Sequence, residues 1–408
     1  MKLKMRQKEN TGGNAGGVRG TGGCCASAVL EKLKVALTLG ALAATALTSA
    51  NAQDRAAVAV DAAGGSRELV VMTRNLYQGA DLTRIVAEAD PSLVPVRVSE
   101  TLAMVLANDF PARAMGIADE VESVRPDVIG LQEAALFQVQ SPGDSLWLPP
   151  DQQAAAQDVL LDYVAILGDA LARKGLRYKA VVTVTNLSME LPMVVAEDGG
   201  YRFDDVRLTD RAVLLVRDDL PVGHLRVLAT SHGHFGTLLS LPVAGTDVPV
   251  LRGWCAADIA VRGRTLRVVN AHLEAWHPLV RCAQAAELLA GPAAVRGDLV
   301  CLGDFNSNAN ADGTDGYGLL LAGGLEDAWW RPGDPAAPPT WGREEDLALD
   351  TIPLVDRLDL VLYRGALDPV DRGVTGDGVA DRVLSTVGED RLLWHSDHAG
   401  VNVTFALP

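Results

Sequence analysis

The 408-residue chain has few aromatic residues, no heptad repeat and no glycine period. Aromatic residues make up 5% of the chain and hydrophobic residues 48%. The 40 glycines show no three-residue period, which excludes a collagen-like protein. The lack of sustained heptads excludes a coiled coil, and the apolar content excludes a disordered acidic chain. A globular protein with ample material for a large core remains.

Basic side chains are also scarce. The chain has 36 Lys and Arg against 52 Asp and Glu, a net charge of -16. This acidity argues against a protein that coats nucleic acid through bulk charge, although it leaves room for a locally basic or metal-filled cleft. Five cysteines are present. Cys301 lies in an apolar run and is predicted to be a buried thiol. The sequence does not decide whether Cys255 and Cys282 form a disulfide.

The first 52 residues have the composition of an export signal. No residue from Val35 to Gln53 is charged, basic residues precede this run, and it ends in the small-x-small sequence Ala50-Asn51-Ala52. A single membrane anchor is the alternative, since the run is 19 residues long. The Ala, Thr and Ser content makes this run only weakly apolar, which favours a cleaved signal peptide over a membrane anchor. The polar stretch before Val29 is longer than a signal's basic head, which indicates translation from near Val18 or Val29.

Removal of residues 1–52 changes the charge of the chain. That segment holds seven basic and two acidic residues. The remaining 356 residues therefore carry 29 basic and 50 acidic side chains, a net charge of -21. Two lysines remain, Lys174 and Lys179. We expect a flexible Ala/Gly-rich leader over 53–66 and one large folded domain over 67–408. The signal predicts a secreted or periplasmic protein.

Beyond the leader, strands are predicted to alternate with helices. Apolar runs predict strands at 68–73, 127–131, 178–184, 212–216, 225–230, 298–302, 358–363 and 399–407. Strands over 248–261 and 265–271 flank the hairpin signal Arg262-Gly263-Arg264. Helices are expected over 98–125, with an interruption near Pro111, over 151–174 and over 280–290. This pattern favours two packed mixed sheets flanked by helices.

Polar residues cluster where the buried strands end. These residues are Asn75, Glu133, His272, Asp304, Asn306, Asp359, Asp397 and His398. Side chains at strand ends are held over a rigid sheet, and chemistry in α/β folds gathers there. A single acid after a strand means little, but five such endings in one chain are hard to explain by loop composition.

These residue types suit a hard cation. Glu133, Asp304 and Asp397 offer the oxygen ligands that Mg²⁺ or Mn²⁺ prefers, with water completing the octahedron. Asn75 and Asn306 can orient a water or a phosphate oxygen without adding charge.

A proton-transfer group accompanies the acids. Asp359 lies in an apolar strand, where an unpaired carboxylate would be costly. A hydrogen bond from His398 would satisfy it, fix the tautomer of the imidazole and raise its basicity. His398 can then remove a proton from water attacking phosphorus, while His272 and a metal stabilise the phosphoryl oxygens.

The ordered set of motifs resembles the endonuclease/exonuclease/phosphatase superfamily. The motifs are Asn75, Gln132-Glu133, Asn270-Ala271-His272-Leu273, Gly303-Asp304-Phe305-Asn306, Arg357-Leu358-Asp359 and Ser396-Asp397-His398. Together they span roughly residues 68 to 407. The resemblance implies a four-layer α/β sandwich and metal-dependent cleavage of phosphoester bonds.

The resemblance also implies residue roles. It assigns metal binding to Glu133, Asn75, Asp304 and Asp397, and catalysis to His398, Asp359, His272, Asn306 and Asp304. After Ala134-Ala135-Leu136, a long insertion through about Lys174 aligns with no characterised branch, so the substrate does not carry over.

The sequence predicts a secreted metal-dependent phosphodiesterase, with Mg²⁺ or Mn²⁺ as cofactor. An extracellular nuclease and a catalytically silent binding module are the alternatives. We expect a monomer that acts on a phosphoester and has no stable nucleic-acid partner, because phosphate tracking normally uses Lys and Arg. His232 and His234 form an alternative metal pair, and Trp329-Trp330 an alternative lipid- or base-contacting surface; a cleft loop and core packing are the favoured interpretations.

Overall fold

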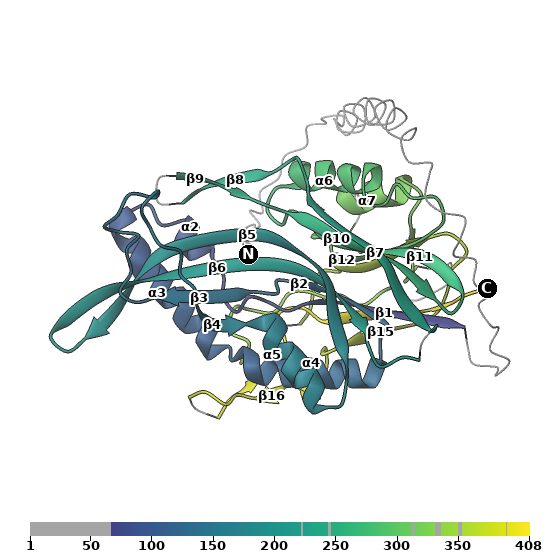
Figure 1. Ribbon diagram of the computed structural model, residues 1–408, viewed down its shortest axis with the longest axis horizontal. Helices are drawn as coiled ribbons and strands as arrows, with labels where there is room; N and C mark the ends of the chain where they lie inside the picture. Colours follow the sequence, from purple (N-terminus) through teal and green to yellow (C-terminus); the bar gives the residue numbers. More distant parts are fainter. Residues whose placement is uncertain are drawn as a thin grey trace, which may run out of the picture.

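The computed structural model describes residues 67–221, 223–243, 246–311, 315–330, 336–349, 353–388 and 390–408. The predicted signal peptide and leader lie outside the described residues. Within that part of the chain, two large β-sheets pack face to face with helices on both outer sides (Figure 1). The predicted four-layer α/β sandwich is therefore confirmed.

The first sheet has eight strands. Their order is β15 (Asp368–Thr375), β18 (Gly400–Ala406), β1 (Glu68–Asn75), β2 (Val128–Gln132), β6 (Gly200–Arg217), β3 (Leu136–Gln140) and β4 (Asp158–Asp162), with β5 (Tyr178–Glu197) also paired to β6. β1 is parallel to β2 and antiparallel to β18. β5 and β6 form a long hairpin that extends beyond the rest of the sheet (Figure 1).

The second sheet has six strands. Their order is β13 (Glu326–Asp327), β14 (Asp359–Arg364), β12 (Asp298–Asp304), β11 (Arg264–His272), β10 (Gly253–Val261) and β7 (Leu225–His234). Two small sheets pair β8 (Leu239–Val243) with β9 (Thr246–Val250), and β16 (Val383–Leu384) with β17 (Leu392–Leu393). The predicted hairpin at Arg262 and Gly263 joins β10 to β11.

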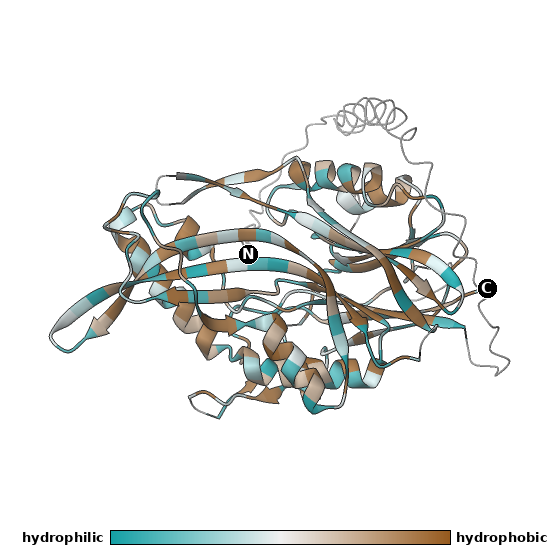
Figure 2. Cartoon of the chain, viewed as in Figure 1, coloured by the Kyte–Doolittle hydropathy of each residue, from teal (hydrophilic) through white to brown (hydrophobic). Residues whose placement is uncertain are grey.

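Helices cover the outer faces of both sheets. The first sheet carries α3 (Val94–Ala107), α4 (Phe110–Val124) and α5 (Tyr163–Arg173), and the second carries α6 (Pro278–Ala290) and α7 (Gly316–Ala322). Short helices are α2 (Thr83–Val86), η1 (Pro91–Leu93) and η2 (Val379–Asp381). The helices are amphipathic (Figure 2); α5 buries Tyr163, Leu167, Ala170 and Leu171, the spacing of one helical face.

The alternation of side chains builds the layers of the core. On β12, Val300 and Leu302 pack between the sheets, whereas Leu299 and Cys301 pack against the outer helices. Gly130 lets the sheets approach closely, because a Cβ there would lie 2.0 Å from the Leu302 side chain. Cys255 is a buried free thiol whose pKa burial raises to about 12, so no bridge joins it to Cys282.

The predicted helix over 151–174 and the predicted strand over 248–261 differ from the structure. The helix predicted over 151–174 is wrong in its first half, where Asp158–Asp162 pairs with β3; Asp162 then caps α5 through its side chain. The strand predicted over 248–261 divides into β9 and β10. The helical interruption predicted near Pro111 is confirmed: the 98–125 segment forms two helices, and Pro111 lies in the first turn of the second, where its missing N–H costs nothing. Among the described residues, no helix is long and apolar enough to cross a membrane.

Candidate active site

The polar strand ends meet at one edge of the two sheets. In the second sheet, strand register places His272 beside Asp304 and Asp304 beside Asp359. In the first sheet, Asn75 ends β1 and Glu133 follows the end of its parallel neighbour β2. Five of the eight residues singled out in the sequence are thus positioned by the sheets themselves.

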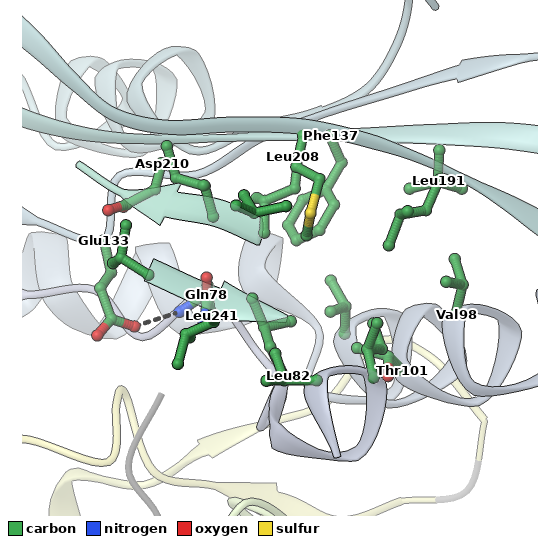
Figure 3. Close-up of a pocket in the computed structure, with 18 of the residues that line it drawn as sticks. Gln78, Leu82, Val98, Thr101, Glu133, Phe137, Leu191, Leu208, Asp210 and Leu241 are labelled. Carbon is green, nitrogen blue, oxygen red and sulfur yellow. Dashed lines mark hydrogen bonds between the residues drawn. The ribbon is translucent and has the colours of Figure 1, made fainter. Parts of the chain in front are cut away.

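Asn75 joins the two principal acids. Its side-chain NH₂ donates to Glu133 Oε1 at 3.2 Å and to Asp304 Oδ2 at 3.1 Å. The side-chain oxygen Oδ1 of Asn75 accepts a hydrogen bond from the Tyr77 backbone N–H at 2.9 Å, which fixes the orientation of the side-chain amide. The backbone N–H of Gln78 donates to Glu133 Oε2 at 3.1 Å (Figure 3). The amide of Asn75 therefore links two buried carboxylates, one from each sheet.

The backbone at these positions has unusual conformations. Glu133 and Asn306 each have a φ of 51°, the left-handed region that non-glycine residues rarely adopt. Such strain costs on the order of 1–3 kcal/mol and concentrates at functional sites. Gly303 has a φ of 148°, and a Cβ there would lie 2.0 Å from the Ala271 carbonyl oxygen. Only glycine fits immediately before Asp304.

Asp359 and His398 form the hydrogen-bonded pair that the sequence predicted. His398 Nδ1 lies 2.7 Å from Asp359 Oδ2, and the Thr340 hydroxyl donates to the same oxygen at 2.6 Å. Both members of the pair are about 1% exposed. The other imidazole nitrogen, Nε2, lies 3.7 Å from Asp304 Oδ2 and 3.8 Å from Asp397 Oδ1. The pair therefore directs Nε2 at the acid cluster.

The remaining predicted residues join the same cluster. His272 Nε2 lies 3.5 Å from Asp304 Oδ2. The Asn306 backbone N–H donates to Asp304 Oδ1 at 3.0 Å. Asp397 Oδ2 accepts from the indole N–H of Trp341 at 3.1 Å. All eight residues are thus linked by close contacts.

The donor set fits a hard divalent cation. Glu133, Asp304 and Asp397 supply carboxylate oxygens, the ligands that Mg²⁺ and Mn²⁺ prefer. Asp210, on β6, adds a buried carboxylate whose Oδ1 accepts no hydrogen bond from the described residues. Burial, followed by the charge of Glu133, raises the pKa of Asp210 to about 6. A bound cation would offset this repulsion between buried acids.

A second grouping, Asp304, Asp359 and His398, also brings ligand atoms within 4.8 Å of one another. Asp359 Oδ2 and His398 Nδ1, however, already bond each other. This geometry favours a proton-handling role for the Asp359–His398 pair.

A sequence model of the endonuclease/exonuclease/phosphatase family matches residues 104–398. The chain belongs to this family. Family members are hydrolases that act on phosphoesters. A comparison with curated proteins finds no match.

The chain is also similar to solved structures. A family protein from Bacteroides thetaiotaomicron is 16% identical, with a TM-score of 0.50 over 84% of this chain and 99% of that one. A mannosyl-6-phosphatase from the same organism is 15% identical, with a TM-score of 0.50 over 83% and 100%. Truncated TDP2 from Caenorhabditis elegans is 19% identical, with a TM-score of 0.45 over 83% and 98%.

In this family member, buried arginines hold the loops that carry the site, a feature that sequence reasoning missed. Arg74 Nη1 donates to the His398 carbonyl at 2.7 Å, and Arg343 Nη1 donates to the same carbonyl at 3.1 Å. Arg113 Nη1 donates to the carbonyls of Leu76 and His395, each at 2.8 Å. Arg74 directly precedes Asn75, but its role could not be predicted from the sequence, because its hydrogen-bond partners lie far along the chain.

Glu120 anchors this arrangement from α4. Its Oε1 accepts from Arg74 Nη2 at 2.8 Å and lies 2.5 Å from His395 Nδ1, and its Oε2 accepts from the Thr375 hydroxyl at 2.7 Å. Burial alone would raise the pKa of Glu120, but Arg74 and His395 outweigh burial and lower it to about 2. Desolvation lowers the pKa of Arg343 to about 10.

The two alternative sites of the sequence lie elsewhere. His232 and His234 are exposed on edge strand β7, where His234 Nε2 bonds the Thr185 carbonyl at 2.7 Å. They lie on a strand and not, as expected, on a loop. Trp329 packs against the core between the sheets, as expected, whereas Trp330 is 69% exposed.

Proposed function

We propose that this family member is an exported, divalent-metal-dependent phosphodiesterase that activates water through His398. The observation that carries this proposal is the Asp359–His398 hydrogen bond of 2.7 Å, with the opposite imidazole nitrogen facing the acids. Asp359 holds the proton on Nδ1, so Nε2 has a lone pair for a water proton. Asp359 then stabilises the imidazolium that forms.

The other residues position the phosphate and the cation. Glu133, Asp304 and Asn75 would hold Mg²⁺ or Mn²⁺, with Asp397 at the His398 side of the cluster. When bound, such a cation stabilises negative charge on phosphoryl oxygens. Asn306 and His272 lie against Asp304, where they can contact the phosphate and orient it for in-line attack.

A nuclease is the second candidate, and the charge distribution disfavours it. The chain after residue 52 has a net charge of -21. The arginines packed behind the site, Arg74, Arg113 and Arg343, are buried and donate to backbone carbonyls. They cannot track a nucleic-acid backbone. We propose accordingly that the protein has no stable nucleic-acid partner and acts as a monomer.

The catalytic proposal is tested with bis-p-nitrophenyl phosphate and Mg²⁺. His398→Ala should lower kcat by about 10²–10⁴-fold, the usual contribution of a general base. Glu133→Ala should also abolish turnover, while circular dichroism shows an intact fold. His232→Ala, on exposed β7, is the matched control and should retain full activity. Full activity in either site variant would refute the site, and inactive wild-type enzyme would favour the silent binding module.

Metal dependence and export need separate measurements. EDTA should remove activity, and added Mg²⁺ or Mn²⁺ should restore it; turnover that survives EDTA would refute the metal requirement. Amino-terminal sequencing of protein recovered outside the cytoplasm should find a start at Gln53, because cleavage is predicted after Ala52. A start at Met1 or Lys2 would refute cleavage.

A further inference from the structure

A largely apolar pocket adjoins the candidate active site. Gln78, Glu133, Asp210, Arg252 and His272 line one end of it. From there it runs between α2 and α3 on one side and the β5–β6 hairpin on the other (Figure 3). The candidate active site and the pocket therefore share Glu133 and His272. One substrate molecule can place its phosphate at the site and another part of itself in the pocket.

Away from the acids, the pocket wall is mainly aliphatic. Val98, Leu82, Leu191 and Leu208 contribute to it from four different segments (Figure 3). Thr101 presents little polarity, because its hydroxyl donates to the Arg97 carbonyl at 2.7 Å. A sugar or inositol ring would lose its hydrogen bonds to water without replacement here.

The composition of the wall also disfavours a nucleobase as the ligand. Bases are held by stacking on aromatic side chains, but Phe137 and Trp276 are the only aromatic residues among the described residues that line the pocket. A flexible hydrocarbon chain needs neither hydrogen bonds nor a stacking surface. Its burial is favourable in proportion to the apolar area removed from water.

A separate hairpin contributes the remaining wall. β8 and β9 pair with each other and with neither large sheet. Leu241 from β8, together with Val248 and Val250 from β9, lines the pocket. The pocket is thus bounded by apolar side chains from the helices, the long hairpin and this small hairpin, with charged groups confined to the end at Glu133.

We propose that this pocket binds the hydrocarbon chain of the substrate, so that the enzyme acts on a lipid phosphoester. The phosphate lies at the Glu133 and His272 end and the chain extends toward Leu191. This inference rests on the proposed function and supplies its substrate class. The β5–β6 hairpin, which follows the predicted insertion in sequence, and α3 account for much of the wall.

Turnover and binding together test the proposal. Alkyl p-nitrophenyl phosphates with methyl, butyl, octyl and dodecyl chains are assayed below their micelle concentrations, with Mg²⁺. We expect kcat/KM to rise with chain length, by up to about fourfold per CH₂ until the pocket is filled. Binding of dodecyl phosphate and methyl phosphate is measured by calorimetry, and the dodecyl compound should bind more tightly with a negative heat-capacity change.

Two matched variants locate the chain. Leu191→Trp fills the far part of the pocket and should remove the gain in kcat/KM for the octyl and dodecyl compounds. Leu228→Trp, on β7 outside the pocket, should behave as wild type.

The outcomes separate this inference from the proposed function. Equal affinity for dodecyl and methyl phosphate, or a chain-length gain that survives Leu191→Trp, would overturn the pocket assignment even if the diester is hydrolysed. Tight, Leu191-dependent binding of dodecyl phosphate without any hydrolysis would support the pocket and refute the catalytic proposal.

Discussion

Replacing Glu120 by glutamine removes a charge that lies beneath the active site and contacts neither substrate nor metal ligand. Glu120 is 6% exposed and holds Arg74, which in turn donates to the His398 carbonyl. Its pKa falls from 4.5 to about 2, because Arg74 and His395 outweigh the cost of burial. Each pKa unit corresponds to about 1.4 kcal/mol, so ionised Glu120 contributes about 3 kcal/mol to the free energy of unfolding at neutral pH.

The sign of the pH dependence follows from the lowered pKa. The contribution of Glu120 is fully present above its unfolded pKa, near 4.5, and is lost as the pH falls from there toward 2. Glu120→Gln should therefore lower the free energy of unfolding by about 3 kcal/mol at pH 7. The difference from wild type should shrink steadily below about pH 4.5.

Urea denaturation followed by tryptophan fluorescence measures both effects. The control is Glu122→Gln, on the same helix α4, whose carboxylate is 45% exposed and lies 3.1 Å from Lys174 Nζ. Such an exposed ion pair contributes about 0–1 kcal/mol. If Glu120→Gln is no more destabilising than Glu122→Gln at pH 7, or if its effect is the same at pH 7 and pH 3, the buried network does not act as described.

Two further changes test the site itself. Asp359→Asn should lower kcat for bis-p-nitrophenyl phosphate by about 10²–10⁴-fold, because an amide NH₂ facing His398 Nδ1 leaves the proton on Nε2; a kcat unchanged across the pH profile would contradict this. Asp210→Asn should stabilise EDTA-treated protein at pH 7, because the pKa of Asp210 is raised to about 6 and ionisation above that pH costs stability. Thermal unfolding should show this gain vanishing below about pH 4, and a destabilised variant would contradict it.

Local patterns predicted most of the sheets. Apolar runs of strand length mark β2, β12 and β14, and the polar residue that follows or begins each strand marks the site. The residues over 158–162 were misassigned because Val159-Leu160-Leu161 suits a helix and an edge strand equally well. Pairing with β3, which a local pattern does not show, makes these residues a strand.

The family, the layered α/β fold and the eight polar residues could all be predicted from local patterns, because periodicity and motif order can be read along the chain. Only the tertiary structure brought these residues into one cluster, through the register of β11, β12 and β14. It alone revealed that Arg74 and Arg343 hold the His398 loop and that an apolar pocket adjoins Glu133. Such contacts join residues up to hundreds of positions apart, and a one-dimensional pattern carries no record of them.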